Sequence, residues 1–185
     1  EHSLSPKLHN YWIKTNNIDA IYEKQKLNDE ELEHIILKVK KEEIYGINVT
    51  VPFKNKIIPY IDQLSPEAEK TKSVNTIYTS NEQIIGHNTD IAGFELSLKK
   101  LKYDVSGKKI LILGAGGVVP SIIFALNRMN VSKITITNRT KEKAEKLKEL
   151  FKELFVADWG DVSDFDMIIN ATSVGLNTNE KINLD

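Results

Sequence analysis

The chain has 185 residues, enough for one large domain or two small ones around a buried core. Its 25 Lys and Arg nearly balance 26 Asp and Glu, whereas a general nucleic-acid-binding protein needs a surplus of positive charge. Hydrophobic residues make up 41% of the chain, which excludes extensive disorder. Cysteine is absent, which excludes a disulfide-based fold, a thiolate metal site and a cysteine nucleophile. The longest uncharged run, 110–127, is interrupted by glycines and a proline, so no membrane span is expected.

The first half, to about residue 103, has an irregular mixture of predicted helices and strands. Asn28 is the predicted N-cap of an amphipathic helix, with Glu31 completing a capping box. That helix should bury one face, formed by Leu32, Ile35, Ile36 and Val39. The other predicted elements are a helix over 6–15 capped by Ser5, a strand over 20–26, a strand over 44–51 that ends at Pro52, a hairpin of 74–79 and 83–87, and a helix from Thr89 or Asp90 to Leu101.

The second half, 104–185, alternates strands with helices. Strands are predicted over 109–113, 133–137 and 167–170, and helices over 117–129 and 141–155. Such alternation indicates right-handed crossovers and a parallel sheet. The apolar runs 110–113 and 167–169 are typical of strands buried on both faces.

A glycine-rich turn joins the first strand of this half to its helix. The turn comprises Gly114, Ala115, Gly116, Gly117 and Val118. Glycines let a backbone approach a ligand closely, and the N-terminus of the following helix attracts a pyrophosphate. The spacing G-x-G-G falls short of the full G-x-G-x-x-G, and an ordinary tight turn is the alternative. The surrounding strand–turn–helix–strand pattern favours a dinucleotide site.

The end of the next strand predicts which dinucleotide binds. An NAD site usually has an acidic residue there for the ribose hydroxyls, but this strand ends in Asn138, Arg139 and Thr140. The guanidinium of Arg139 can grip a 2′-phosphate, and Lys143 can add a second positive charge. The alternative is that both cations simply begin a solvated helix. We favour NADP as the cofactor.

Polar residues gather at predicted strand ends in the first half. Asn48 and Thr50 point to the same face of their strand, and Lys54 follows just beyond the strand end. Taken singly, Lys54 reads as a surface lysine and Asp90 as a helix N-cap. Together with a dinucleotide domain they indicate alcohol–ketone redox chemistry, in which the lysine exchanges a proton with the substrate oxygen and the carboxylate orients it. The four histidines show no ligand spacing, so no metal is expected.

Together with several further motifs, these residues resemble the shikimate dehydrogenase family. The motifs that carry the resemblance occur in the family's order along nearly the whole chain: 2–6 (HSLSP), 48–54 (NVTVPFK), 74–76 (VNT), 88–90 (NTD), 114–117 (GAGG), 138–140 (NRT) and 170–173 (NATS). The resemblance implies an α/β fold, with an N-terminal α/β substrate-binding domain over 1–103 followed by a partial Rossmann-like NADP-binding domain over 104–185.

The resemblance also implies an activity, the NADPH-dependent reversible reduction of 3-dehydroshikimate to shikimate on the route to chorismate and aromatic amino acids. Lys54 would be the acid/base and Asp90 its partner. The implied substrate-binding residues are Ser3, Ser5, Asn48, Thr50, Asn75 and Asp90. The implied cofactor-binding residues are Gly114, Ala115, Gly116, Gly117, Val118, Asn138, Arg139, Thr140, Lys143, Thr172 and Ser173.

Two alternatives stay open at this point. One is a quinate/shikimate dehydrogenase of broader specificity, and the other is a truncated relative that binds ligand without turnover. Family members begin with a strand before the 2–6 motif and continue past Asp185, so the chain is expected to lack segments at both ends. The expected partner is a small-molecule substrate, with no nucleic acid and no membrane, and with a homodimer left open. The expected location is the cytoplasm.

Overall fold

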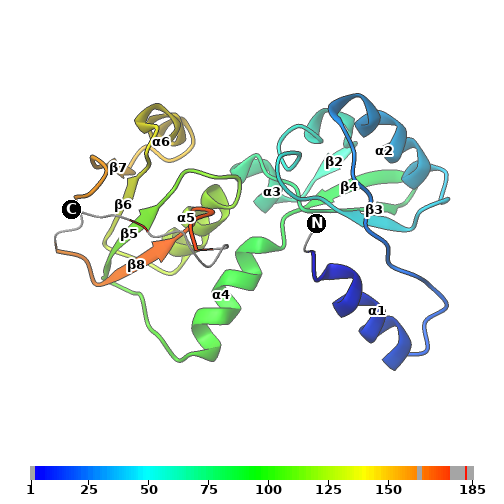
Figure 1. Ribbon diagram of the computed structural model, residues 1–185, viewed down its shortest axis with the longest axis horizontal. Helices are drawn as coiled ribbons and strands as arrows, with labels where there is room; N and C mark the ends of the chain where they lie inside the picture. The colour runs from blue at the N-terminus through cyan, green and yellow to red at the C-terminus, as the bar shows by residue number, and fades with distance from the viewer. Residues whose placement is uncertain (1–2, 162–163, 176–181, 183–185) are drawn as a thin grey trace.

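The computed structural model describes residues 3–161, 164–175 and 182. It has two lobes, each built on its own sheet (Figure 1). The sheet of the first lobe has the strand order β1-β3-β4-β2, and the sheet of the second lobe has the order β7-β6-β5-β8. Helix α4 (Asp90–Lys100) lies between the lobes.

The hairpin predicted in the first lobe is confirmed. It consists of β3 (Thr76–Ser80) and β4 (Gln83–His87), which pair antiparallel. The turn residues Asn81 and Glu82 both have positive φ, which matches the twist of a tight hairpin. The short strands β1 (Gly46–Asn48) and β2 (Gln63–Leu64) complete the sheet. Thus the strand predicted over 44–51 is only three residues long, and a cis Val51–Pro52 peptide follows it.

The predicted amphipathic helix is also confirmed. The 3₁₀ turn η1 (Asp29–Glu31) leads into α2 (Leu32–Lys40), and Asn28 and Glu31 form both bonds of the capping box. The four residues predicted for the inner face of α2 are all buried. They pack with side chains of the sheet, of a short helix and of the loops around it, which include Ile57, Ala68, Val74, Ile77 and Ile84. The turn η2 (Ile58–Tyr60) and helix α3 (Pro66–Thr71) complete this lobe.

Two predictions near the start of the chain are wrong. Helix α1 spans Ser5–Thr15 with Leu4 at the N-cap, so Ser5 lies inside the helix, and its backbone N–H donates to Ser3 Oγ at 3.3 Å. Segment 20–26 is not a strand, because no described strand pairs with it. Its backbone is held instead by the side chain of Asn10, which bonds both the N–H and the carbonyl of Tyr22.

The second lobe has the predicted parallel sheet. Strand β5 (Lys109–Leu113) lies in the middle, between β6 (Lys133–Thr137) and β8 (Met167–Asn170). The glycine-rich turn leads into α5 (Val119–Arg128), which packs against the sheet. Residues 110–113 are fully buried, as predicted.

Two predictions in the second lobe are wrong. The helix predicted over 141–155 ends early: α6 (Lys141–Lys146) continues only as the turn η3 (Leu147–Glu149). Phe155–Val156 then forms β7, because its backbone pairs with the free edge of β6. Strand β8 is not buried on both faces, since it is the outermost strand of the described sheet and Ile168 is 50% exposed.

Helix α4 connects the lobes. It begins directly after the loop that follows β4, yet Leu98 and Phe94 pack into the core of the second lobe. The predicted domain boundary at residue 103 assigns α4 to the first domain, whereas Leu98 and Phe94 of α4 pack in the core of the second lobe. Within the described ranges, no helix has the length and apolar character needed to cross a membrane.

Candidate active site

Lys54 and Asp90 meet although 36 residues separate them in the chain. Lys54 Nζ lies 2.6 Å from Asp90 Oδ2, and the two side chains are 13% and 23% exposed. The backbone carbonyl of Lys54 accepts a bond from the Val74 N–H at 2.8 Å, which fixes the loop after the cis proline to the start of the hairpin. The pair is therefore held by backbone bonding on one side and by the first turn of α4 on the other.

Asn75 holds the other oxygen of the Asp90 carboxylate. Its Nδ2 donates to Asp90 Oδ1 at 2.8 Å and to Thr89 Oγ1 at 2.9 Å, and its Oδ1 accepts the Thr89 N–H at 2.9 Å. The interpretation of Asp90 as a helix N-cap is wrong, because Thr89 occupies that position and Asp90 is the first helical residue. Its carboxylate is thus free of a capping role and faces a lysine and an amide.

Tyr22 extends this network, although the sequence did not predict it as a site residue. Its hydroxyl donates to Asn48 Oδ1 at 3.0 Å, and Asn48 Nδ2 donates to Thr76 Oγ1 at 3.3 Å, beside Asn75. Partial burial raises the pKa of the Tyr22 hydroxyl, and a hydrogen bond with Ser5 opposes this effect. No spacing in the sequence signals this contact, since it joins residues 26 apart.

The remaining substrate-site candidates lie at the edge of this network. Ser5 reaches it through Tyr22, whereas Ser3 and Thr50 are exposed. The backbone carbonyl of Thr50 accepts the Phe53 N–H at 2.9 Å, which shapes the turn before Lys54. Among the described residues, no hydrogen bond joins Ser3 or Thr50 to the Lys54–Asp90 pair. His2, part of the first family motif, lies outside the described residues.

The glycine-rich turn of the second lobe is tightly built. Gly114 has a φ of +104, and a Cβ at this position would lie 2.9 Å from the Ala171 carbonyl oxygen and 3.0 Å from Thr172 Cγ2. The Ala115 N–H donates to Asn138 Oδ1 at 3.1 Å, so the end of β6 is bonded to the turn. Gly116 and Gly117 are exposed. A Cβ on Gly117 would lie 4.0 Å from Val51 Cγ2, which brings the turn to the loop that carries Lys54.

The other cofactor-site candidates surround this turn. Arg139, Thr140 and Lys143 are exposed where α6 begins, and Asn138 Nδ2 donates to the Thr140 carbonyl at 2.7 Å. Thr172 bonds the Asn170 side chain through both its N–H and its hydroxyl, and Ser173 is exposed. A glycine turn with exposed backbone, followed by exposed cations at the end of the next strand, fits a phosphorylated dinucleotide.

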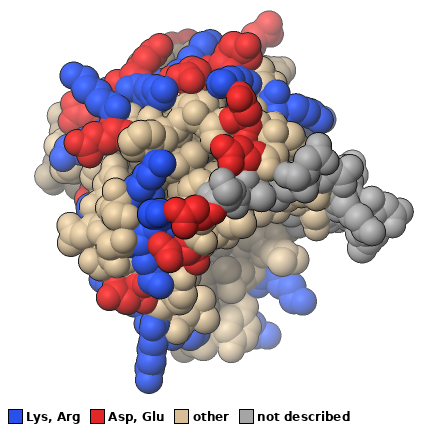
Figure 2. Space-filling view, turned by 90° about the vertical axis from the view of Figure 1, so that its left-hand side faces the viewer, with Lys and Arg blue, Asp and Glu red and all other residues tan. Residues whose placement is uncertain are grey.

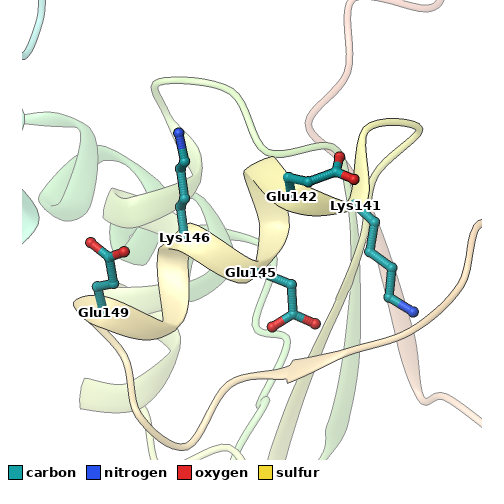
Figure 3. Close-up of a pocket in the computed structure, with 5 residues that line it drawn as sticks. All are labelled: Lys141, Glu142, Glu145, Lys146 and Glu149. Carbon is teal, nitrogen blue, oxygen red and sulfur yellow. The ribbon is translucent and has the colours of Figure 1, made fainter.

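None of the candidate residues lines either of the two hollows described on the surface. One, of about 410 Å³, runs along α6 and is lined by three glutamates and two lysines (Figure 3). A second follows β7 and the outer edge of β6. On the side of the second lobe that Figure 2 shows, acidic and basic side chains are interspersed. Lys54 and Asp90 line neither hollow, so the chemistry of the site is not in these hollows.

Comparison with known proteins gives concordant results. The family described as "Shikimate dehydrogenase substrate binding domain" matches residues 1–77, and "Shikimate / quinate 5-dehydrogenase" matches residues 95–181. Shikimate dehydrogenase (NADP(+)) from Pelagibacter ubique (strain HTCC1062) is 56% identical over 185 residues, which are 100% of this chain and 70% of that protein.

Solved structures agree with the sequence relatives. The crystal structure of shikimate dehydrogenase from Aquifex aeolicus has a TM-score of 0.90 at 41% identity and covers 97% of this chain and 68% of its own. Shikimate 5-dehydrogenase from Thermus thermophilus, in complex with NADP(H) and shikimate, has a TM-score of 0.85 at 32% identity and covers 95% and 66%. The chain therefore spans about two thirds of the length of these relatives. The expected fold, an α/β substrate-binding domain followed by a Rossmann-like domain, is confirmed.

Proposed function

Because the chain belongs to the shikimate dehydrogenase family, we propose that its protein catalyses the NADP-dependent, reversible reduction of 3-dehydroshikimate to shikimate. The observation that carries this proposal is the 2.6 Å contact between Lys54 Nζ and Asp90 Oδ2, with Asn75 on the second carboxylate oxygen. An ammonium and a carboxylate held together in this way can exchange a proton with a substrate oxygen and orient its hydroxyl. The exposed Lys56–Asp29 pair is also close, but the side chains of Lys54 and Asp90 are much more buried, at 13% and 23% exposed.

In this proposal the residues of the first lobe handle the proton. The Lys54 ammonium donates a proton to the carbonyl oxygen of 3-dehydroshikimate as that oxygen gains negative charge, and it accepts the proton in the reverse direction. Asp90 keeps the ammonium in place and accepts a hydrogen bond from a substrate hydroxyl. Asn48, Thr50 and Asn75 bind or position the hydroxyls, and Ser3 and Ser5 bind the substrate carboxylate.

The second lobe would hold NADP. The bound nicotinamide supplies or accepts the hydride. Gly114, Ala115, Gly116, Gly117 and Val118 bind the pyrophosphate through the backbone of the turn. The 2′-phosphate is bound by Asn138, Arg139, Thr140 and Lys143, while Thr172 and Ser173 lie near the cofactor. The close approach of the turn to Val51 supports a site shared by the two lobes.

A single assay tests the proposed function. Nicotinamide absorbance is followed with shikimate or quinate, each with NADP or NAD, on the whole protein. Turnover of shikimate with NADP, and little with quinate, supports the proposal. Comparable turnover of quinate supports the broader quinate/shikimate dehydrogenase, and binding without any turnover supports the non-catalytic relative. In the same proposal the protein works in the cytoplasm on a small molecule and not on nucleic acid or a membrane, and a homodimer stays a prediction.

Replacing Arg139 with alanine tests the NADP assignment. We expect the affinity for NADP to fall about tenfold or more, since a charged hydrogen bond to the 2′-phosphate is lost, and the affinity for NAD to stay nearly unchanged. The measurement is a fluorescence titration with each dinucleotide. Lys146→Ala, at the far end of the helix that begins two residues after Arg139, is the control and should alter neither affinity. Equal losses for NADP and NAD in Arg139→Ala would refute the 2′-phosphate role.

A further inference from the structure

Asn88 lies at the junction of the two lobes, between the end of β4 and the start of α4, and is 1% exposed. All its side-chain bonds are to other elements of that junction. Its Nδ2 donates to Thr71 Oγ1 at 3.0 Å and to Ser121 Oγ at 2.8 Å, and its Oδ1 accepts the Asp90 N–H at 3.0 Å. One buried amide thus joins three segments of the chain.

These three partners belong to different parts of the molecule. Thr71 ends α3 in the first lobe, Ser121 lies in the first turn of α5 in the second lobe, and Asp90 begins α4. Ser121 and Thr71 are 0% and 1% exposed, so water cannot replace a lost bond without opening the junction. Hydrogen bonds in such dry surroundings are strong and fix geometry.

The bond to Ser121 connects two parts of the proposed site. Ser121 follows the last residue of the glycine-rich turn by three positions in the chain, and α5 begins directly after that turn. At the other end of the same amide, the Asp90 backbone is held, and the Asp90 carboxylate contacts Lys54. A shift of α5 relative to Asn88 would therefore move the turn relative to the Lys54–Asp90 pair.

We propose that Asn88 is a positioning residue that keeps the Lys54–Asp90 pair in register with the glycine-rich turn by bonding Ser121 and the Asp90 backbone at once. This inference rests on the proposed function. Another bridge between the lobes, Arg128, cannot serve this purpose. Its side chain is 51% exposed, contacts Glu67 and Glu95, and lies at the last residue of α5, far along the helix from the turn.

Two substitutions distinguish a positioning role of Asn88 from a contribution to the stability of the fold alone. Ser121→Ala removes the bond that crosses to α5. Thr71→Val removes the bond that stays within the first lobe, together with the bond that the Thr71 hydroxyl donates to the Glu67 carbonyl. Each leaves one N–H of the Asn88 amide without its partner, so both should lower the melting temperature. Alanine is the best helix former, so the Ser121 variant should fold.

Only the Ser121 variant should lose turnover. We expect its kcat to fall roughly tenfold, because small displacements of reacting groups are costly, while the KM for shikimate stays near the wild-type value. Thr71→Val should keep its kcat within about twofold despite a similar loss of thermal stability. Equal kcat losses in the two variants, or an unchanged kcat in Ser121→Ala, would overturn the inference.

Hydrogen exchange gives a readout that does not need turnover. The Asp90 backbone amide, followed by NMR without ligands, should exchange roughly tenfold faster in Ser121→Ala than in Thr71→Val. If the wild-type protein fails to turn over shikimate, the proposed function is wrong, and the exchange rates alone decide whether Asn88 holds the start of α4 through α5. Equal exchange rates in the two variants contradict that role.

Discussion

Replacing Lys54 with alanine is expected to lower kcat by about 10²- to 10⁴-fold, the usual contribution of a positioned acid/base group. The reason is the geometry around this lysine. Its ammonium contacts Asp90 Oδ2 at 2.6 Å, and no other lysine contacts that carboxylate in the described structure. NADPH should bind with nearly wild-type affinity, because the glycine-rich turn belongs to the other lobe. Steady-state kinetics and a cofactor titration on the same preparation measure both effects.

Lys56 offers a matched control for this experiment. It lies two residues further along the same loop, and its ammonium pairs with the exposed Asp29 at 2.8 Å. Exposed ion pairs contribute little, so Lys56→Ala should keep kcat within about twofold of the wild-type value. Unaltered turnover in the Lys54 variant, or an equal loss in both variants, would remove Lys54 from the proposed mechanism.

The second large effect is expected for Gly114→Ala. The added methyl group would lie 2.9 Å from the Ala171 carbonyl oxygen, at a φ of +104 that residues with a side chain rarely adopt. Backbone strain and the close contact together should lower the free energy of unfolding by roughly 2 to 4 kcal/mol. Because the turn would have to shift, NADP affinity should fall as well. Thermal unfolding and a cofactor titration test the two parts.

Gly116→Ala is the corresponding control. A Cβ there would have Ala171 as its nearest neighbour at 3.8 Å, an ordinary contact, and its φ is not in the left-handed region. We expect less than about 1 kcal/mol of destabilisation at this position. Its effect on NADP binding is a separate matter, since a side chain on the exposed turn can obstruct a pyrophosphate. Equal destabilisation at the two glycines would show that the packing against Ala171 is not the constraint.

Elements with a local signal could be predicted from the sequence. The capping box of Asn28 and Glu31, the hairpin turn at Asn81 and Glu82, and the strand before Gly114 all depend on neighbours within a few residues. Strand β7 could not be predicted in this way. Phe155 and Val156 become a strand only because the edge of β6 is free to pair with them, and the helical pattern before them gave no sign of it.

The same distinction applies to the candidate site. The type and spacing of residues singled out Lys54 and Asp90, and the contact between them agrees with that prediction, although their chemical roles stay a proposal. Tyr22 was not singled out, and Asn88 was named only as part of the 88–90 motif, without a role of its own. Each is important through a distant partner: Asn48 for Tyr22, and Ser121 for Asn88. Hydrogen bonds across 26 and 33 positions have no counterpart in a local motif.

The shared helix α4 ties the folding of the two lobes together. Its first residue carries a carboxylate of the proposed site, while Leu98 near its other end fills the core of the second lobe. A polypeptide that stopped at residue 103 would leave that leucine facing water, and one that began there would leave a gap in the second core. The two halves are therefore not interchangeable modules, and an exchange of either half between relatives would have to carry the helix with the lobe that buries it.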